Sequence, residues 1–212
     1  MGMCPLCSER AGKRYCPAKD FEICAVCCGS KREVEIDCPS HCAYLKASRS
    51  YEAEKERRIP DPELASRVRR FDNSFVERNH PVMDAVCMAV AEERPNSPWL
   101  RDTDVIDVYK ALVATMKTLS SGIYYESLPE GAVRISLFRR LKALLDELMQ
   151  PDSAAARRTL KVSEAIDILD FLTVAAEANS SVRPRSRRYV DWVSERFSRN
   201  PQTEQSSGLI IP

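Results

Sequence analysis

Histidine and glycine are scarce in this chain of 212 residues, which has only two histidines and six glycines. His41 and His80 are too few for a metal site or a proton-transfer system built on several histidines. No P-loop or dinucleotide-binding fingerprint is present, and no apolar run approaches the roughly 20 residues that a membrane-spanning helix needs. We therefore expect a protein that is not an enzyme and that has no membrane partner.

Cysteine is nearly absent after residue 42, whereas eight of the nine cysteines lie at or before it. A disulfide framework is disfavoured, because no apolar signal-peptide region precedes Cys4 and crowded C-x2-C pairs are typical of metal sites. An iron–sulfur cluster is also disfavoured, because one cluster would leave half of these cysteines unused. Eight thiolates match two closed tetrahedral sites, so we expect two structural zinc ions. Their expected ligands are Cys4, Cys7, Cys16, Cys24, Cys27, Cys28, Cys38 and Cys42.

Neither sign of charge is in clear excess, since the chain has 32 Lys or Arg and 31 Asp or Glu and a formal net charge of +1. With reduced thiols and no signal peptide, this composition is typical of a cytoplasmic protein, which is the location we expect. The one later cysteine, Cys87, has apolar neighbours and no base tied to it by a motif. We expect it to be a buried, inert thiol.

Cysteine spacing and side-chain alternation predict the local structure of residues 4–37. A C-x2-C pair forms one metal knuckle, so Cys4 and Cys7 belong to one site. Polar and apolar residues alternate in Lys31–Asp37, with Val34 and Ile36 on one side. This alternation predicts a short, half-exposed strand.

A helix is expected to follow that strand. Pro39 is favoured in the first turn of a helix, and no breaker interrupts the chain before residue 59, so we expect one helix over residues 39–58. Cys38 and Cys42 would then lie on one helical face. A knuckle, strands and a helix whose first turn donates two ligands are the outline of a treble-clef finger.

This pattern resembles the interleaved two-zinc fingers of the MYND and HIT type, over residues 4–42 only. The motifs that carry the resemblance are Cys4-x2-Cys7, Tyr15-Cys16-Pro17, Cys24-x3-Cys28 and Cys38-x3-Cys42. The chain as a whole is also similar to bacterial proteins with no assigned function, so that wider resemblance implies no activity.

The resemblance implies how the ligands are shared between two sites. One site is implied for Cys4, Cys7, Cys24 and Cys28, and the other for Cys16, Cys38, Cys42 and one further residue. The family has that last ligand where Lys19 stands here, and the remaining cysteine, Cys27, is the natural substitute. Which of Cys27 and Cys28 joins which site stays open, as does His41 as a replacement for Cys42.

The rest of the chain predicts amphipathic helices, separated by a break at His80-Pro81 and a loop at residues 93–98. Asp61 is the expected cap of the first helix, and Asp102 or Thr103 that of the third. The expected helical segments are marked by Leu64–Phe75, Val82–Arg94, Val105–Leu119, Leu137–Leu148, Ile166–Ala176 and Ser186–Ser198.

The predicted fold class is therefore mainly α: a small two-zinc Cys-rich finger with short β-strands, followed by an all-α multi-helix domain. We expect the finger at residues 1–45, a helical connector continuous with it at 46–60, the helical domain at 61–199 and a flexible tail at 200–212.

Charge guides the functional interpretation. Residues 1–58 hold eleven Lys or Arg and nine Asp or Glu, and eight thiolates with two zinc ions would bring the finger to a net charge near −2. Nucleic-acid-binding fingers instead tend to be strongly basic. Because the resembling fingers commonly serve protein–protein contacts, we expect an intracellular zinc-binding adaptor with a protein partner.

Two alternatives follow from other residues. The basic segment Arg183–Arg199 could bind nucleic acid through Arg185, Arg187 and Arg188, with an aromatic ring stacked on a base. The adjacent Cys27 and Cys28 could instead offer a spare thiol to a redox sensor that releases zinc on oxidation.

Overall fold

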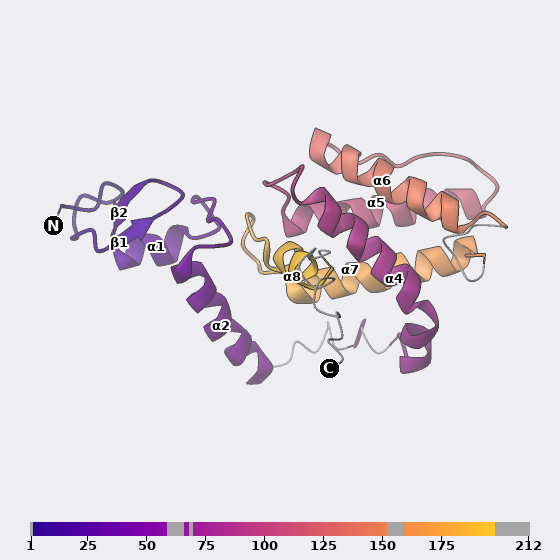
Figure 1. Cartoon of the computed structure of the whole chain (residues 1–212), viewed down its shortest axis with the longest axis horizontal. Helices are drawn as coiled ribbons and strands as arrows, with labels where there is room; N and C mark the ends of the chain where they lie inside the picture. The colour runs from indigo at the N-terminus through magenta and orange to yellow at the C-terminus, as the bar shows by residue number, and fades with distance from the viewer. Residues whose placement is uncertain (1, 59–65, 68–69, 152–158, 198–212) are drawn as a thin grey trace, which may run out of the picture.

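The computed structural model describes residues 2–58, 66–67, 70–151 and 159–197. A small Cys-rich finger with a two-stranded sheet precedes an all-helical domain, which confirms the predicted fold class (Figure 1). We call residues 2–42 the finger and residues 70–197 the helical domain. Each has its own buried core, and neither core includes residues of the other. The described helices include none that is long and apolar enough to cross a membrane.

The finger is built on a short antiparallel sheet and one small helix. Strand β1 (Arg14–Cys16) pairs with β2 (Phe21–Ile23), so that Cys16 lies opposite Phe21. Helix α1 (Ala25–Lys31) follows directly, and the Sγ atom of Cys24 caps it by accepting a hydrogen bond from the Cys27 N–H at 3.3 Å. Because Cys24 lies between the last residue of β2 and the first residue of α1, it is held next to Cys27 in the first turn of the helix.

The expected strand at Lys31–Asp37 is wrong. The N–H groups of Val34, Glu35 and Ile36 all donate to the carbonyl of Lys31, which makes a tight turn rather than an extended segment. Glu33 allows this turn by adopting a φ of 53°. Ile36 is buried and Val34 is 41% exposed, so the two do not share a side.

The next helix, α2 (Ala43–Arg58), begins four residues later than expected. A helix from residue 39 would require the Cys38 carbonyl to accept from the Cys42 N–H. That carbonyl instead accepts from the Arg187 guanidinium at 3.0 Å, and the Cys42 N–H donates to the Pro39 carbonyl at 2.9 Å. A side chain 149 residues away therefore competes with the first turn and delays the helix.

The helical domain contains five described helices: α4 (Asn73–Glu93), α5 (Asp102–Ser120), α6 (Ala132–Leu148), α7 (Val162–Asn179) and α8 (Arg188–Phe197). Helix α5 lies between α6 and α7, and α4 packs against α8 and α6 (Figure 1). The helices expected at Val105–Leu119, Leu137–Leu148, Ile166–Ala176 and Ser186–Ser198 are confirmed, with ends shifted by a few residues.

The expected caps at the start of α5 need correction. Arg101 is the N-cap, and the Asp104 carboxylate accepts from its N–H at 3.0 Å. Asp102 is fully buried and instead accepts from the Ser186 hydroxyl at 2.6 Å and from the Val190 N–H at 3.0 Å. It thereby joins the start of α5 to the start of α8.

The expected helix break at His80-Pro81 is also wrong, because α4 continues through Pro81. Proline has no N–H to donate to the carbonyl four residues earlier, that of Glu77. The His80 ring compensates by hydrogen bonding to that carbonyl through Nδ1 at 2.8 Å. The expected cap at Asp61 and the tail at 200–212 lie outside the described residues.

Candidate metal centre

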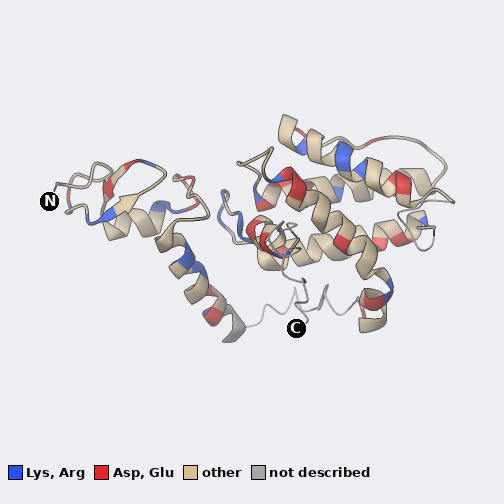
Figure 2. Ribbon diagram, viewed as in Figure 1, with Lys and Arg blue, Asp and Glu red and all other residues tan. Residues whose placement is uncertain are grey.

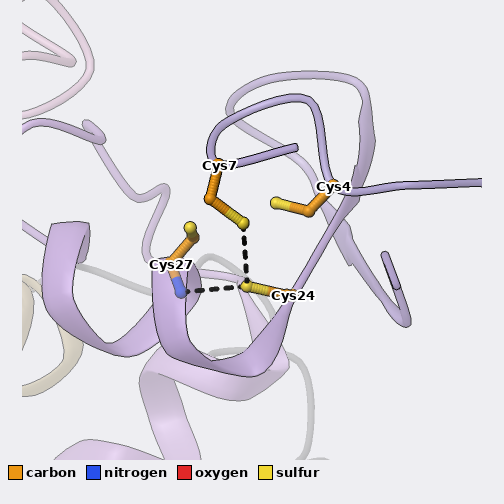
Figure 3. A group of neighbouring side chains, drawn as sticks. All are labelled: Cys4, Cys7, Cys24 and Cys27. Carbon is orange, nitrogen blue, oxygen red and sulfur yellow. Dashed lines mark hydrogen bonds between the residues drawn. The ribbon is translucent and has the colours of Figure 1, made fainter. Parts of the chain in front are cut away.

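Four cysteine side chains of the finger converge on one point. The Sγ atoms of Cys4, Cys7, Cys24 and Cys27 all lie within 4.8 Å of one another and point inward (Figure 3). The Cys7 and Cys24 sulfurs are 3.9 Å apart. Within the described part of the chain, no other group of three or more His, Cys, Asp or Glu side chains is gathered this closely. This cluster could hold one metal ion.

The first two cysteines of the cluster are positioned by a tight turn. The Cys4 carbonyl accepts from the N–H groups of Cys7 and Ser8, at 3.3 and 2.8 Å, and Ser8 closes the turn with a φ of 54°. The other two are positioned by the start of α1, where Cys24 is the N-cap and Cys27 lies in the first turn. Each pair therefore has C-x2-C spacing.

The cluster uses Cys27 where the family resemblance implied Cys28. Helical geometry gives the reason, since Cys27 lies close to the cap residue Cys24, whereas Cys28 projects about 100° further around α1. Cys28 instead lies 3.7 Å from the Nη2 atom of Arg32, on another side of the helix.

Local hydrogen bonds make the pKa values of the thiols in the cluster differ. Burial opposes ionisation of Cys4, but hydrogen bonds from the backbone N–H groups of Cys24, Leu6 and Cys7 outweigh it and lower the pKa of Cys4 to about 6. The backbone N–H of Glu9 likewise lowers the pKa of Cys7. Burial and the neighbouring thiols raise the pKa of Cys27 to about 12. Without a metal, Cys4 and Cys7 therefore ionise more readily than Cys27.

A four-thiolate cluster has a clear chemical consequence. Thiolate ligands in this number fill all four positions of a tetrahedral ion and leave none for a substrate, so the chemistry such a site supports is structural. Seven buried residues of the finger core are cysteines, namely Cys4, Cys16, Cys24, Cys27, Cys28, Cys38 and Cys42, and a bound metal would stabilise a core this small.

The other four expected ligands, Cys16, Cys28, Cys38 and Cys42, are all buried in the same core. Burial raises the pKa of Cys38 to about 11, and the negative charges of Cys42 and Cys16 add to this effect. Their sulfur atoms are not gathered into a group like the first one.

A second turn repeats the geometry of the first. The Cys16 carbonyl accepts from the N–H groups of Lys19 and Asp20, at 3.0 and 2.8 Å, and Asp20 has a φ of 58°. Cys16 thus corresponds to Cys4, and Lys19 stands where Cys7 stands in the first turn. The two turns therefore share one hydrogen-bonding pattern, with a lysine in place of the second cysteine.

His41, the open alternative to Cys42, is not part of the cluster. Its side chain is exposed and lines a cleft described below, whereas Cys42 is buried. Cys87 is buried among the helices of the other domain, and its burial raises the pKa of this thiol to about 11. The prediction of a buried Cys87 is confirmed.

The arginines considered for nucleic-acid contacts lie in the loop before α8 and at the first residue of α8, where the helical domain meets the finger (Figure 2). The Arg187 guanidinium donates to the Asp37 carboxylate and to the Cys38 carbonyl, and its side chain is 3% exposed. The Arg185 Nε–H donates to the Val34 carbonyl at 3.0 Å. Arg188 begins α8 and is half-buried. Arg185 and Arg187 therefore bind the finger.

These contacts belong to a larger network that we call the arginine junction. It comprises six guanidinium groups and four carboxylates, each within 4.0 Å of an opposite charge: Arg49, Arg94, Arg101, Arg183, Arg185 and Arg187 with Glu33, Asp37, Glu52 and Asp191. The basic run at 183–188 was visible in the sequence. The acidic residues that it meets, 131 to 150 positions away, carried no sequence signal.

Comparison of the chain with protein-family models, with curated proteins and with solved structures finds no match.

Proposed function

We propose that the protein is a protein-binding module whose finger is held together by two structural zinc ions. The first ion is bound by Cys4, Cys7, Cys24 and Cys27, whose sulfur atoms already converge. The second is bound by the remaining buried cysteines of the finger, namely Cys16, Cys28, Cys38 and Cys42.

Two observations support the second site. The turn at Cys16 repeats the knuckle turn at Cys4, so Cys16 is presented as a ligand even though Lys19 replaces its usual partner. Cys28 is free to take that place because Cys27 belongs to the first cluster. Arg32 lies beside the Cys28 sulfur, where its positive charge would offset part of the negative charge of a four-thiolate zinc site.

Exposed apolar side chains on the finger and α2 give the strongest support for a binding role. Nearly all the cysteines face inward, whereas large apolar and aromatic side chains face outward: Met3, Tyr15, Val26, Val34, Tyr44 and Tyr51. Tyr44 and Tyr51 are separated by two helical turns and share a face of α2, and the Arg14 guanidinium lies 4.8 Å from the Tyr44 ring centroid. Tyrosine and arginine are enriched at protein interfaces and at their energetic hot spots.

The alternatives receive less support. Arg185 and Arg187 are bound to the finger and would have to leave it to contact nucleic acid. A redox sensor needs a spare thiol, and the arrangement proposed here assigns both Cys27 and Cys28 to metal ions.

Two measurements test the proposed function. Elemental analysis of the purified protein should find two zinc ions per chain. Affinity capture from native cells should recover protein partners that survive nuclease treatment and are lost with the Tyr44→Ala/Tyr51→Ala double variant.

A control of the same chemistry is Tyr124→Ala/Tyr125→Ala, which removes two exposed rings from the helical domain and should leave capture unchanged. Loss of all partners on nuclease treatment, or identical capture by both double variants, would contradict the proposed binding face.

A further inference from the structure

A cleft of about 410 Å³ opens where the finger meets the helical domain. The finger contributes Pro39, Ser40 and His41 to its wall, and the helical domain contributes the loop after α4 together with Arg187. Cavities of this size, with mostly apolar walls and a few convergent polar groups, are typical of small-molecule sites.

The charged residues that line the cleft are of one sign. Arg94 and Arg187 face it and, within the described part of the chain, none of its lining residues is an Asp or Glu. A second cavity, beside α6, differs, because Arg101 and Arg134 are matched there by Asp104 and Glu130. The carboxylate partners of these two arginines, Asp191 and Asp37, do not line the first cleft, so its wall presents positive charge and favours an anionic ligand.

The arginine junction strengthens this preference. Among the described residues, its six guanidinium groups exceed its four carboxylates by two charges. Among the described residues, the buried Nε–H groups of Arg49, Arg101 and Arg187 have no hydrogen-bond acceptor. Burial lowers the pKa of Arg94, and the positive charges of Arg187 and Arg49 lower it further against the opposing effect of Asp191. An added negative charge would relieve this repulsion.

The walls of the cleft favour a planar group beside that charge. Trp99 is 65% exposed, so its indole ring can stack with a ligand. The Arg187 guanidinium lies 5.5 Å from the Trp99 ring centroid, which places the positive charge next to the stacking surface. The exposed side chain of His41 lines the cleft from the finger, and the Ser40 hydroxyl lies 3.1 Å from Nη2 of Arg94.

We propose that this cleft binds a small phosphate ester that carries a planar ring, the chemistry of a mononucleotide. The phosphate lies on the side of Arg94, Ser40 and His41, and the ring stacks on Trp99. The site needs the finger docked on the helical domain, because each contributes part of the wall. Zinc ions bound as proposed above would add negative charge behind Cys38, so the zinc-loaded full chain is the form to test.

Isothermal titration calorimetry with adenosine 5′-monophosphate tests the site, with adenosine and inorganic phosphate as the two partial ligands. We expect saturable binding of the monophosphate and binding about ten-fold weaker or worse for either part alone, because stacking and phosphate contacts both contribute. Trp99→Ala should weaken binding about ten-fold, and His41→Ala should weaken it to a smaller extent.

Trp192→Ala is the matched control, since Trp192 is the only other tryptophan, is partly exposed, and does not line the cleft. It should leave the affinity unchanged. Three results would overturn the proposal: no heat of binding at millimolar monophosphate, equal affinity for inorganic phosphate alone, or an affinity for single-stranded oligonucleotides that rises steeply with their length. The zinc content is measured on the same samples, so failure of this site is distinguishable from failure of the zinc assignment.

Discussion

Gly12 shows at the scale of one residue how tightly the finger is packed. A Cβ atom at Gly12 would lie 2.8 Å from the carbonyl oxygen of Glu22, which is backbone and cannot rotate away. The adjacent Lys13 N–H donates to the Ile23 carbonyl at 3.1 Å, so the two segments are held at this separation.

We therefore expect Gly12→Ala to lower the free energy of unfolding of the finger by roughly 1–3 kcal/mol, as overpacking does elsewhere. Gly29→Ala is the control, because Gly29 lies within α1 with nothing within 4 Å of the added methyl group. It should be neutral or stabilising by up to about 1 kcal/mol. The zinc affinity of both variants is measured by competition with a chelator. Equal zinc affinities would contradict the close approach of Gly12 to the Glu22 carbonyl.

The assignment of Cys27 and Cys28 is tested by combining substitutions. If Cys7 and Cys27 share one metal, Cys7→Ser/Cys27→Ser removes a single site and should retain one zinc ion. Cys7→Ser/Cys28→Ser breaks both proposed sites and should retain none. Cys87→Ser is the control and should retain two. Zinc counts in which the first two double variants change places would restore the ligand set that the family resemblance implies.

Helix α4 illustrates how an element tolerates a residue that should interrupt it. Pro81 removes one hydrogen bond of the helix, and the His80 ring binds the carbonyl of Glu77 that this leaves without its helical donor. Because the compensation is local, we expect Pro81→Ala to stabilise the protein, by roughly 1 kcal/mol, through the restored N–H.

A double-mutant cycle measured by urea denaturation separates the two effects. His80→Ala should destabilise the protein by roughly 0.5–1.5 kcal/mol when Pro81 is present. In the Pro81→Ala background the same substitution should cost less, because the helix then satisfies the carbonyl itself. Equal costs in both backgrounds would show that His80 does not substitute for the missing bond.

At the scale of the whole molecule, Asp191 joins three parts of the structure. It accepts from Ser40 of the finger at 2.7 Å, from Arg49 of α2 at 2.7 Å and from Arg94 after α4 at 3.1 Å. Its side chain and those of the two arginines are 12 to 20% exposed, so Asp191→Ala would leave two largely buried guanidinium groups without this carboxylate.

We expect Asp191→Ala to lower the free energy of unfolding by on the order of 3 kcal/mol and to make α2, which carries Arg49, more susceptible to limited proteolysis. Asp107→Asn is the control, because Asp107 pairs with Arg134 at the surface and should cost less than about 1 kcal/mol. A denaturation curve for Asp191→Ala that coincides with the control would contradict a joining role.

Metal removal should separate the two cores. The finger core contains seven of the eight N-terminal cysteines, whereas the core of the helical domain is built from apolar side chains of α4 to α8. Chelation should therefore unfold the finger while most of the helical circular dichroism signal remains. Loss of the helical signal at the same chelator concentration would show that the two cores fold as one unit.

The sequence by itself determined the mainly helical class, the separation of a Cys-rich segment from helices and the positions of most helices. These features depend on local composition and on apolar periodicity, which a linear sequence records directly. It also determined the knuckle at Cys4 and Cys7, because C-x2-C spacing is a short-range constraint.

Only the tertiary structure decided the features that depend on contacts with distant residues or on the direction in which a side chain projects. The Cys38 carbonyl is taken by Arg187, and this contact delays α2. The choice of Cys27 over Cys28 depends on the rotation of α1 relative to the first knuckle. The arginines before α8 form ion pairs with carboxylates of the finger instead of facing solvent. Each outcome depends either on a contact between residues far apart in the chain or on the rotation of about 100° per residue around a helix. The spacing of residues along the sequence specifies neither.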